Sequence, residues 1–244
     1  AGLLFGIDRT TKLLYAADPA AGKFVAETAL SSPPDYVRFV APIGEVWVTE
    51  PRSHRIERFS VGTGDHVSLS KMGFIDVPGG PESLVVDAKR GRAYTNLWTD
   101  HTLAIDLSSA AVVASWPNTC AGSRGLAMDE ERGYVLVGCE EGKAIALDAG
   151  NDGKIAGRFG FGSGVDIIGF NPVLRHLYLP GAQSATLAVI LVRNDGLLLK
   201  LGEFPTVADA HCVTSDDLGQ IWICDPDHGQ ILMMKDGYRG SGDK

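Results

Sequence analysis

One stretch near the end of the chain concentrates the side chains that most often do chemistry. The segment "AHCVTSDDLGQIWICDPDHG", residues 210–229, holds two of the four cysteines, two of the six histidines and four aspartates. Such a set could bind a metal ion, form a disulfide across a hairpin, or belong to a repeat whose polar residues share no task. The chain has two cysteine pairs, Cys120 with Cys139 and Cys212 with Cys224. A zinc site is disfavoured, because neither pair has the close C-x-x-C type of spacing found in zinc sites.

The elements that must position these residues repeat along the chain. Short apolar runs are bounded by Gly, Asp, Asn and Pro, which predicts strands rather than helices. Equivalent positions recur about every 42 to 47 residues, close to the period of β-propeller blades with four strands each. The five aligned positions are Asp35, Glu82, Arg124, Asp166 and His211.

We therefore predict an all-β fold, a six-bladed β-propeller of four-stranded antiparallel blades that forms a single domain over residues 1–244. The first and last blades are each expected to have three strands. Either the chain is a fragment or the ring closes imperfectly; alternatively, "LLFGID" is the outer strand of the last blade. The predicted blades span residues 1–31, 32–78, 79–120, 121–162, 163–207 and 208–240.

One hairpin carries a family resemblance. The segment "DAKRGRAYTN", residues 87–96, resembles the Asp-x-x-x-Gly-x-x-Tyr-Val-Thr-Asn pattern of YVTN-type, YncE-like β-propellers, although the Val is missing. Other blades carry degraded versions such as "GEVWVTE" and "GQIWICD". The resemblance implies the propeller fold and a secreted, periplasmic or surface-associated protein. It implies no chemistry, because propellers host many functions.

A propeller places two sets of loops on one face, those that enter the inner strands and those between the second and third strands. The five aligned residues stand where the inner strands begin, so we predict that they surround the channel mouth. A second set ends the second strands on the same face, and Trp98 could be a stacking platform there. The predicted ligand-binding residues are Asp35, Glu82, Arg124, Asp166, His211, Glu50, Trp98, Glu140 and Asp225.

Three interpretations of this mouth compete. The leading one is binding of a small molecule, a metal ion or a protein, without catalysis. Carboxylate oxygens suit Ca²⁺ or Mg²⁺, and an imidazole would suit a transition metal better. The metal-ligand set would be Asp35, Glu82, Asp166 and His211.

The second interpretation is a metal-dependent hydrolase, similar in architecture to six-bladed lactonases of the gluconolactonase and paraoxonase type. A bound ion would polarise a carbonyl and activate water, a carboxylate or His211 would move the proton, and Arg124 would hold an anionic group. The third is a polar ring around a water-filled channel, with the guanidinium neutralising its neighbours.

The cysteines fall where hairpin register can join them. A turn centred on Leu218 places Cys212 directly opposite Cys224, and the corresponding hairpin two blades earlier opposes Cys139 to Ser123. Cys120 lies three residues further out, in a loop that could fold back. We predict disulfides Cys212–Cys224 and Cys120–Cys139; the alternative is four buried thiols. Disulfides suit a secreted or periplasmic protein whose signal peptide has been removed.

Charge and hydropathy argue against binding to nucleic acid and against insertion into a membrane. The formal net charge of −8 argues against nucleic acid, whose phosphates need a basic surface. No apolar run reaches the roughly 18 residues that a membrane-spanning helix needs. The expected partner is therefore a small-molecule or protein ligand, with the oligomeric state left open. Among the histidines, His176 begins a strand and is expected to be structural.

Overall fold

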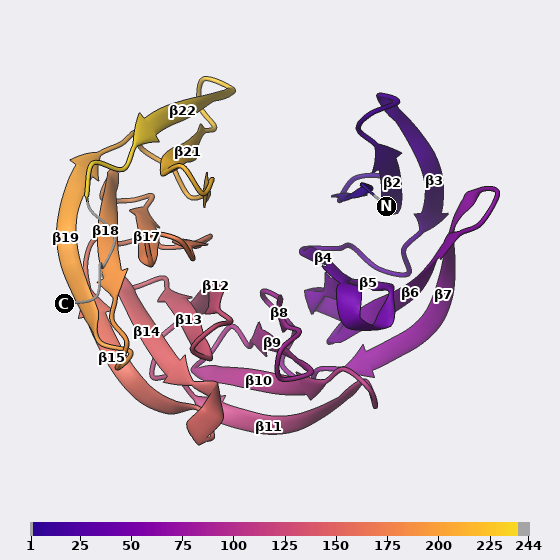
Figure 1. Ribbon diagram of the computed structural model, residues 1–244, viewed down its shortest axis with the longest axis horizontal. Helices are drawn as coiled ribbons and strands as arrows, with labels where there is room; N and C mark the ends of the chain where they lie inside the picture. Colours follow the sequence, from indigo (N-terminus) through magenta and orange to yellow (C-terminus); the bar gives the residue numbers. More distant parts are fainter. Residues whose placement is uncertain (1, 239–244) are drawn as a thin grey trace. The chain divides into compact units, whose positions relative to one another are not determined.

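The computed structural model describes residues 2–238 and shows an all-β protein with six antiparallel sheets (Figure 1). This is a six-bladed β-propeller, as predicted. In the described residues, three short 3-10 helices are the only helical elements, η1 (Ala41–Ile43), η2 (Pro51–Ser53) and η3 (Ala149–Asn151). The predicted limits of the first blade at residue 1 and the last blade at residue 240 lie outside the described residues.

The first three blades follow the predicted pattern of three, four and four strands. The first contains β1 (Leu4–Asp8), β2 (Leu13–Asp18) and β3 (Lys23–Ala29). The second contains β4 (Val37–Val40), β5 (Glu45–Glu50), β6 (Arg55–Thr63) and β7 (Val67–Asp76), and the third β8 (Val85–Asp87), β9 (Arg92–Asn96), β10 (His101–Asp106) and β11 (Ala111–Pro117). Strand β1 pairs with β2, so "LLFGID" belongs to the first blade and not to the last.

The last three blades have four, four and three strands, again as predicted. The fourth contains β12 (Ser123–Asp129), β13 (Tyr134–Cys139), β14 (Lys143–Asp148) and β15 (Lys154–Gly160). The fifth contains β16 (Gly169–Asn171), β17 (His176–Gly181), β18 (Thr186–Val192) and β19 (Leu198–Pro205). The sixth contains β20 (Val213–Ser215), β21 (Gln220–Asp225) and β22 (Gln230–Lys235).

The chain divides into two compact units, which we describe separately. Unit 1 comprises residues 1–98 and 103–115, and unit 2 comprises residues 99–102 and 116–244. The blades of unit 1 are the first three, apart from short pieces of β10 and β11, and the blades of unit 2 are the last three. The expectation that the whole chain is one domain stays a prediction.

Each unit has its own buried apolar clusters. In unit 1, Trp47 and Ile56 of the second blade pack with Leu84 and Ile105 of the third. In unit 2, Leu136 and Ala146 of the fourth blade lie in one cluster with Leu177, Leu179 and Ile190 of the fifth. Strands β5, β13 and β17 are buried along their whole length.

Candidate functional site

Backbone hydrogen bonds between blades position three of the five aligned residues. In unit 2, the Gly125 N–H donates to the carbonyl of Asp166 at 2.9 Å, and the Ile167 N–H donates to the carbonyl of His211 at 2.9 Å. A Cβ on Gly125 would collide with that Asp166 carbonyl, so a glycine is needed where the blades approach. Arg124, Asp166 and His211 are therefore held on three consecutive blades by direct backbone contact.

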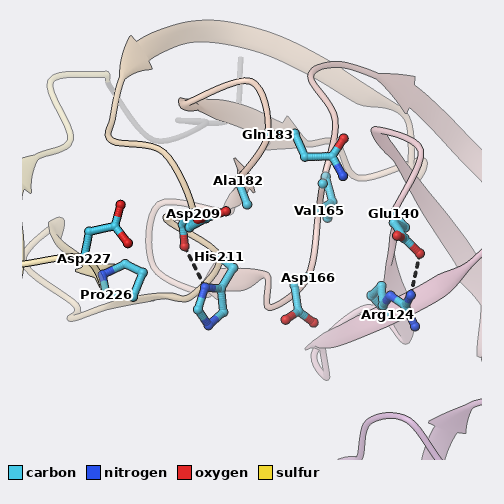
Figure 2. Close-up of a pocket in the computed structure, with 11 residues that line it drawn as sticks. Arg124, Glu140, Val165, Asp166, Ala182, Gln183, Asp209, His211, Pro226 and Asp227 are labelled. Carbon is cyan, nitrogen blue, oxygen red and sulfur yellow. Dashed lines mark hydrogen bonds and ion pairs between the residues drawn. The ribbon is translucent and has the colours of Figure 1, made fainter. Parts of the chain in front are cut away.

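These three residues line one open hollow of about 500 Å³ in unit 2, which we call the hollow (Figure 2). Glu140, also predicted, joins them. Inner-strand entry loops and the turns after β13, β17 and β21 all reach the hollow, so within unit 2 both loop sets share one face. The remaining lining residues are Gly164, Val165, Ala182, Gln183, Asp209, Pro226 and Asp227.

The lining of the hollow is acidic. Four of the lining residues carry a carboxylate, namely Glu140, Asp166, Asp209 and Asp227, and one, Arg124, carries a guanidinium. Arg124 forms an ion pair with Glu140. Figure 2 shows this pair at one side of the hollow, the Asp166 and His211 side chains next to it, and Asp227 at the other side. The lining residues therefore include more acidic than basic side chains.

His211 has a defined ring orientation. Its Nδ1 lies 2.6 Å from the carbonyl oxygen of Asp209, and because a carbonyl can only accept, Nδ1 carries the hydrogen. In the neutral ring Nε2 is then the acceptor. The same Nδ1 lies 3.9 Å from Sγ of Cys224, so His211 touches both the hollow and the disulfide of the last blade.

The predicted metal-ligand set is divided between the units. Asp35 and Glu82 belong to unit 1, whereas Asp166 and His211 belong to unit 2. Across residues 2–238, no three His, Cys, Asp or Glu side chains group closely enough to hold a metal ion. Metal binding by these four residues stays a prediction.

The predicted site residues of unit 1 are largely covered. Asp35 forms an ion pair with Arg9, and its side chain is only 17% exposed. Glu82 is buried, and its backbone N–H donates to the carbonyl of Asn96 at 2.9 Å. Glu50 is wholly buried and accepts hydrogen bonds from the Ser32 N–H and the Arg55 Nε, each at 2.7 Å. Their contact with a ligand stays a prediction.

Two other predicted residues differ in their surroundings. Trp98 is 48% exposed and follows β9, so its ring is accessible. Asp225 is buried and accepts hydrogen bonds from Gln230 Nε2 at 2.8 Å and His228 Nδ1 at 2.9 Å. These bonds hold the pKa of Asp225 below its ordinary value and fix the β21–β22 turn. The carboxylate that this turn presents to the hollow is Asp227.

Sequence reasoning missed Gln183 and Asp209 as lining residues. Gln183 lies in the turn after β17, where the aligned sequence "RHLYLPG" ends in a proline and a glycine and gave no polar signal. Asp209 lies two residues before the aligned His211, and its φ of 59° shows that it turns the chain into the last inner strand. A search for Asp or Asn two residues before each aligned position could have found it, since these residues tolerate a positive φ.

Both predicted disulfides are present. Cys120 and Cys139 have Cα atoms 5.3 Å apart, and Cys212 and Cys224 have Cα atoms 5.5 Å apart. Ser123 pairs with Cys139 as the register predicted. The entry loop folds back to Cys120 around Asn118, whose side chain accepts the Cys120 N–H at 3.1 Å and donates to Ser123 Oγ at 2.8 Å.

Two further observations bear on the sequence predictions. His176 is buried in β17, with Nδ1 2.7 Å from an oxygen of Asp236, which fits the structural role expected of it. Among the helices of the described residues, none has the length and hydropathy to cross a membrane.

Comparison with known proteins identifies the fold but no family. No model of a known protein family matches the sequence, and no curated protein matches it either. Among solved structures, a functionally unknown protein from Desulfotomaculum acetoxidans is 9% identical with a TM-score of 0.78, over 96% of this chain and 79% of that one. A chain of a mitotic checkpoint complex is 12% identical with a TM-score of 0.76, over 93% and 71%. A chain of Kuenenia stuttgartiensis hydrazine synthase is 12% identical with a TM-score of 0.57, over 96% and 92%.

Proposed function

We propose that the hollow of unit 2 binds a small organic cation, such as an alkylammonium or guanidinium group, and that the protein acts by binding rather than by catalysis. The observation that carries this proposal is the lining itself, which contains four acidic residues from three blades and one arginine. The volume of about 500 Å³ lies in the range of small-molecule sites.

The spread of the carboxylates favours an organic cation over a metal ion. A Ca²⁺ ion needs six to eight oxygens at about 2.3–2.6 Å around one point. The carboxylates of the hollow come from three blades, and no compact ligand group occurs in the described residues. Apolar atoms of Val165, Ala182 and Pro226 also line the hollow, and these would pack against the carbon chain of an amine.

The cellular setting is part of the same proposal. All four cysteines are paired, which supports a secreted or periplasmic location, because disulfides persist in oxidising compartments. The YVTN-type assignment is supported by the hairpin β8–β9, in which Tyr94, Thr95 and Asn96 are buried and Thr95 Oγ1 donates to the carbonyl of Ser83. In this hairpin the Thr95 bond joins the second strand to the segment that enters the inner strand.

Calorimetric titration with 1,4-diaminobutane tests the proposal, with succinate as the anionic control. We expect the diamine alone to bind, and we expect Asp166→Asn and Asp227→Asn each to weaken it about tenfold, as loss of a charged hydrogen bond would. Asp65→Asn, which removes the same charge from an exposed turn of unit 1, should bind normally. Binding should also weaken as salt is added.

Two results would reject the proposal. One is a diamine affinity that Asp166→Asn and Asp227→Asn leave unchanged, and the other is no binding of any organic cation. The lactonase-like or esterase-like alternative is examined with the same protein and a lactone substrate in the presence of Ca²⁺ or Mg²⁺. Metal-dependent turnover would replace the binding proposal with the hydrolase.

A further inference from the structure

The two disulfides differ in how accessible they are. Cys120 is 4% exposed and Cys139 is fully buried. Cys212, which immediately precedes the short inner strand β20, and Cys224, in β21, are both partly exposed. Exchange with an external thiol requires the attacking sulfur to reach the disulfide. Of the two bonds, only Cys212–Cys224 meets this condition in the folded protein.

The surroundings of Cys224 suit a departing thiolate. The backbone N–H of Cys212 donates to Sγ of Cys224 at 3.1 Å, and such a donor stabilises negative charge on sulfur. The Nδ1 hydrogen of His211, which the Asp209 carbonyl accepts, also lies near this sulfur, with Nδ1 3.9 Å from it. No corresponding contact is found for Cys212 in the described residues, so the two sulfurs of this disulfide are unequal.

We propose that Cys212–Cys224 is a redox-active disulfide that dithiol reductants open in the folded protein, with Cys224 as the leaving sulfur, whereas Cys120–Cys139 is structural. A reductant thiolate attacks Sγ of Cys212, a new S–S bond forms there, and the bond to Cys224 breaks. The second thiolate of the reductant then attacks the reductant sulfur that is bound to Cys212, and Cys212 leaves as a thiolate. The reductant leaves as a disulfide, the protein has gained two electrons, and the two cysteine thiolates take protons from water.

This chemistry is placed where it would alter the entry loop of the last blade. Strand β20 has three residues, and Cys212 immediately precedes it. When the disulfide opens, the hydrogen bond from the Cys224 N–H to the Cys212 carbonyl, at 3.2 Å, remains as a link between these two residues. The loop that carries His211 is then less constrained. The inference goes beyond cation binding and does not depend on it.

The decisive experiment uses the folded wild-type protein and dithiothreitol. Samples are quenched with N-ethylmaleimide at successive times, and peptide mass spectrometry counts the label on each cysteine, while circular dichroism follows the fold. We expect Cys212 and Cys224 to be labelled at least about tenfold faster than Cys120 and Cys139. Equal rates, or faster opening of Cys120–Cys139, would overturn the proposal.

Two further measurements separate a redox role from mere exposure. Reduced glutathione, a monothiol, should leave its mixed disulfide on Cys212; finding it on Cys224 would reverse the assignment of the leaving sulfur and overturn the mechanism. His211→Asn should slow opening about tenfold, because the imidazole no longer stabilises the departing thiolate. His228→Asn, in the same blade, should open at the wild-type rate. If His211→Asn also opens at that rate, His211 has no role in the step.

Discussion

At the scale of single residues, unit 1 contains two neighbouring glutamates whose carboxylates are both buried. Glu50 ends β5 and Glu57 lies in β6, at diagonal positions of the paired strands, and both side chains are fully buried. Burial, followed by the charge of Glu57, raises the pKa of Glu50, although Arg55 opposes this. Burial also acts to raise the pKa of Glu57, but hydrogen bonds from Lys71 and Ser31 outweigh it and lower that pKa. Of the two carboxylates, Glu50 is therefore the one that takes up a proton first as the pH falls.

Substitution by glutamine distinguishes the two members of this pair. Glu50→Gln removes a carboxylate whose charge is disfavoured by burial and by Glu57, so the free energy of unfolding at pH 7 should change by less than about 1 kcal/mol. Glu57→Gln removes the carboxylate that Lys71 contacts at 2.9 Å and should cost about 2–3 kcal/mol. Urea denaturation of both variants measures this. Equal losses would contradict the opposite pKa shifts of the two carboxylates.

The same pair predicts the direction of the pH dependence. Glu57, with its lowered pKa, stabilises the fold above its ordinary pKa of 4.5, and this contribution is lost as the pH falls. Glu50 acts in the opposite sense, since its contribution is complete below 4.5 and is lost as the pH rises through its raised pKa. Glu57→Gln should therefore weaken the acid-side loss of stability measured by urea denaturation from pH 3 to 5. An unchanged acid limb would contradict the assignment.

At this scale the sequence could predict residue type and approximate position but not burial. Glu50 and Asp225 both end a second strand, as expected for the face of a propeller. Their oxygens are nevertheless taken up by neighbours, which include the Ser32 N–H for Glu50 and the Gln230 amide for Asp225. The segment at Ser32 lies 18 residues from Glu50 in the chain, and no local pattern indicates that it will fold over this carboxylate.

At the scale of elements, hairpin register was predictable and blade-to-blade pairing was not. The turn centred on Leu218 correctly predicts that Thr214 pairs with Trp222 and Ser215 with Ile221, because antiparallel register follows from the turn. The predicted inner strands of the third and fifth blades, β8 and β16, are present and have only three residues each. Ahead of β16 the amide of Ile167 bonds to the next blade at His211, and that partner is remote in sequence.

Close approach of turns within unit 2 gives a test at this scale. Gly142, in the β13–β14 turn, has a φ of 90°, and a Cβ there would collide with the carbonyls of Gly162 and Phe161. Gly142→Ala should therefore cost about 3 kcal/mol, from backbone strain plus the collision. Gly229→Ala is the matched control, since Gly229 has a φ of 62° but open space around it, and should cost about 1 kcal/mol. Thermal denaturation that shows equal losses would exclude the collision as the cause.

At the scale of the whole molecule, the repeat predicts the number of strands per blade, because every blade is built on the same hairpin pattern. The repeat does not predict a division into two units. The five aligned residues are equivalent in sequence, but Asp35 and Glu82 lie in one unit and Arg124, Asp166 and His211 in the other. The repeat pattern describes every blade in the same way. The division into units depends on long-range contacts, which form between residues far apart in the chain.

The distribution of cysteines gives the last prediction, because both disulfides lie in unit 2. Each unit has its own buried clusters, so scanning calorimetry should show a calorimetric enthalpy larger than the van't Hoff enthalpy, as for independently melting parts. Replacing Cys120 and Cys139 together by serine releases a loop of 19 residues and should cost about 3 kcal/mol. That loss should appear as a lower melting temperature for one transition while the other stays in place. A single transition that shifts as a whole would instead mean that the chain unfolds as one cooperative domain.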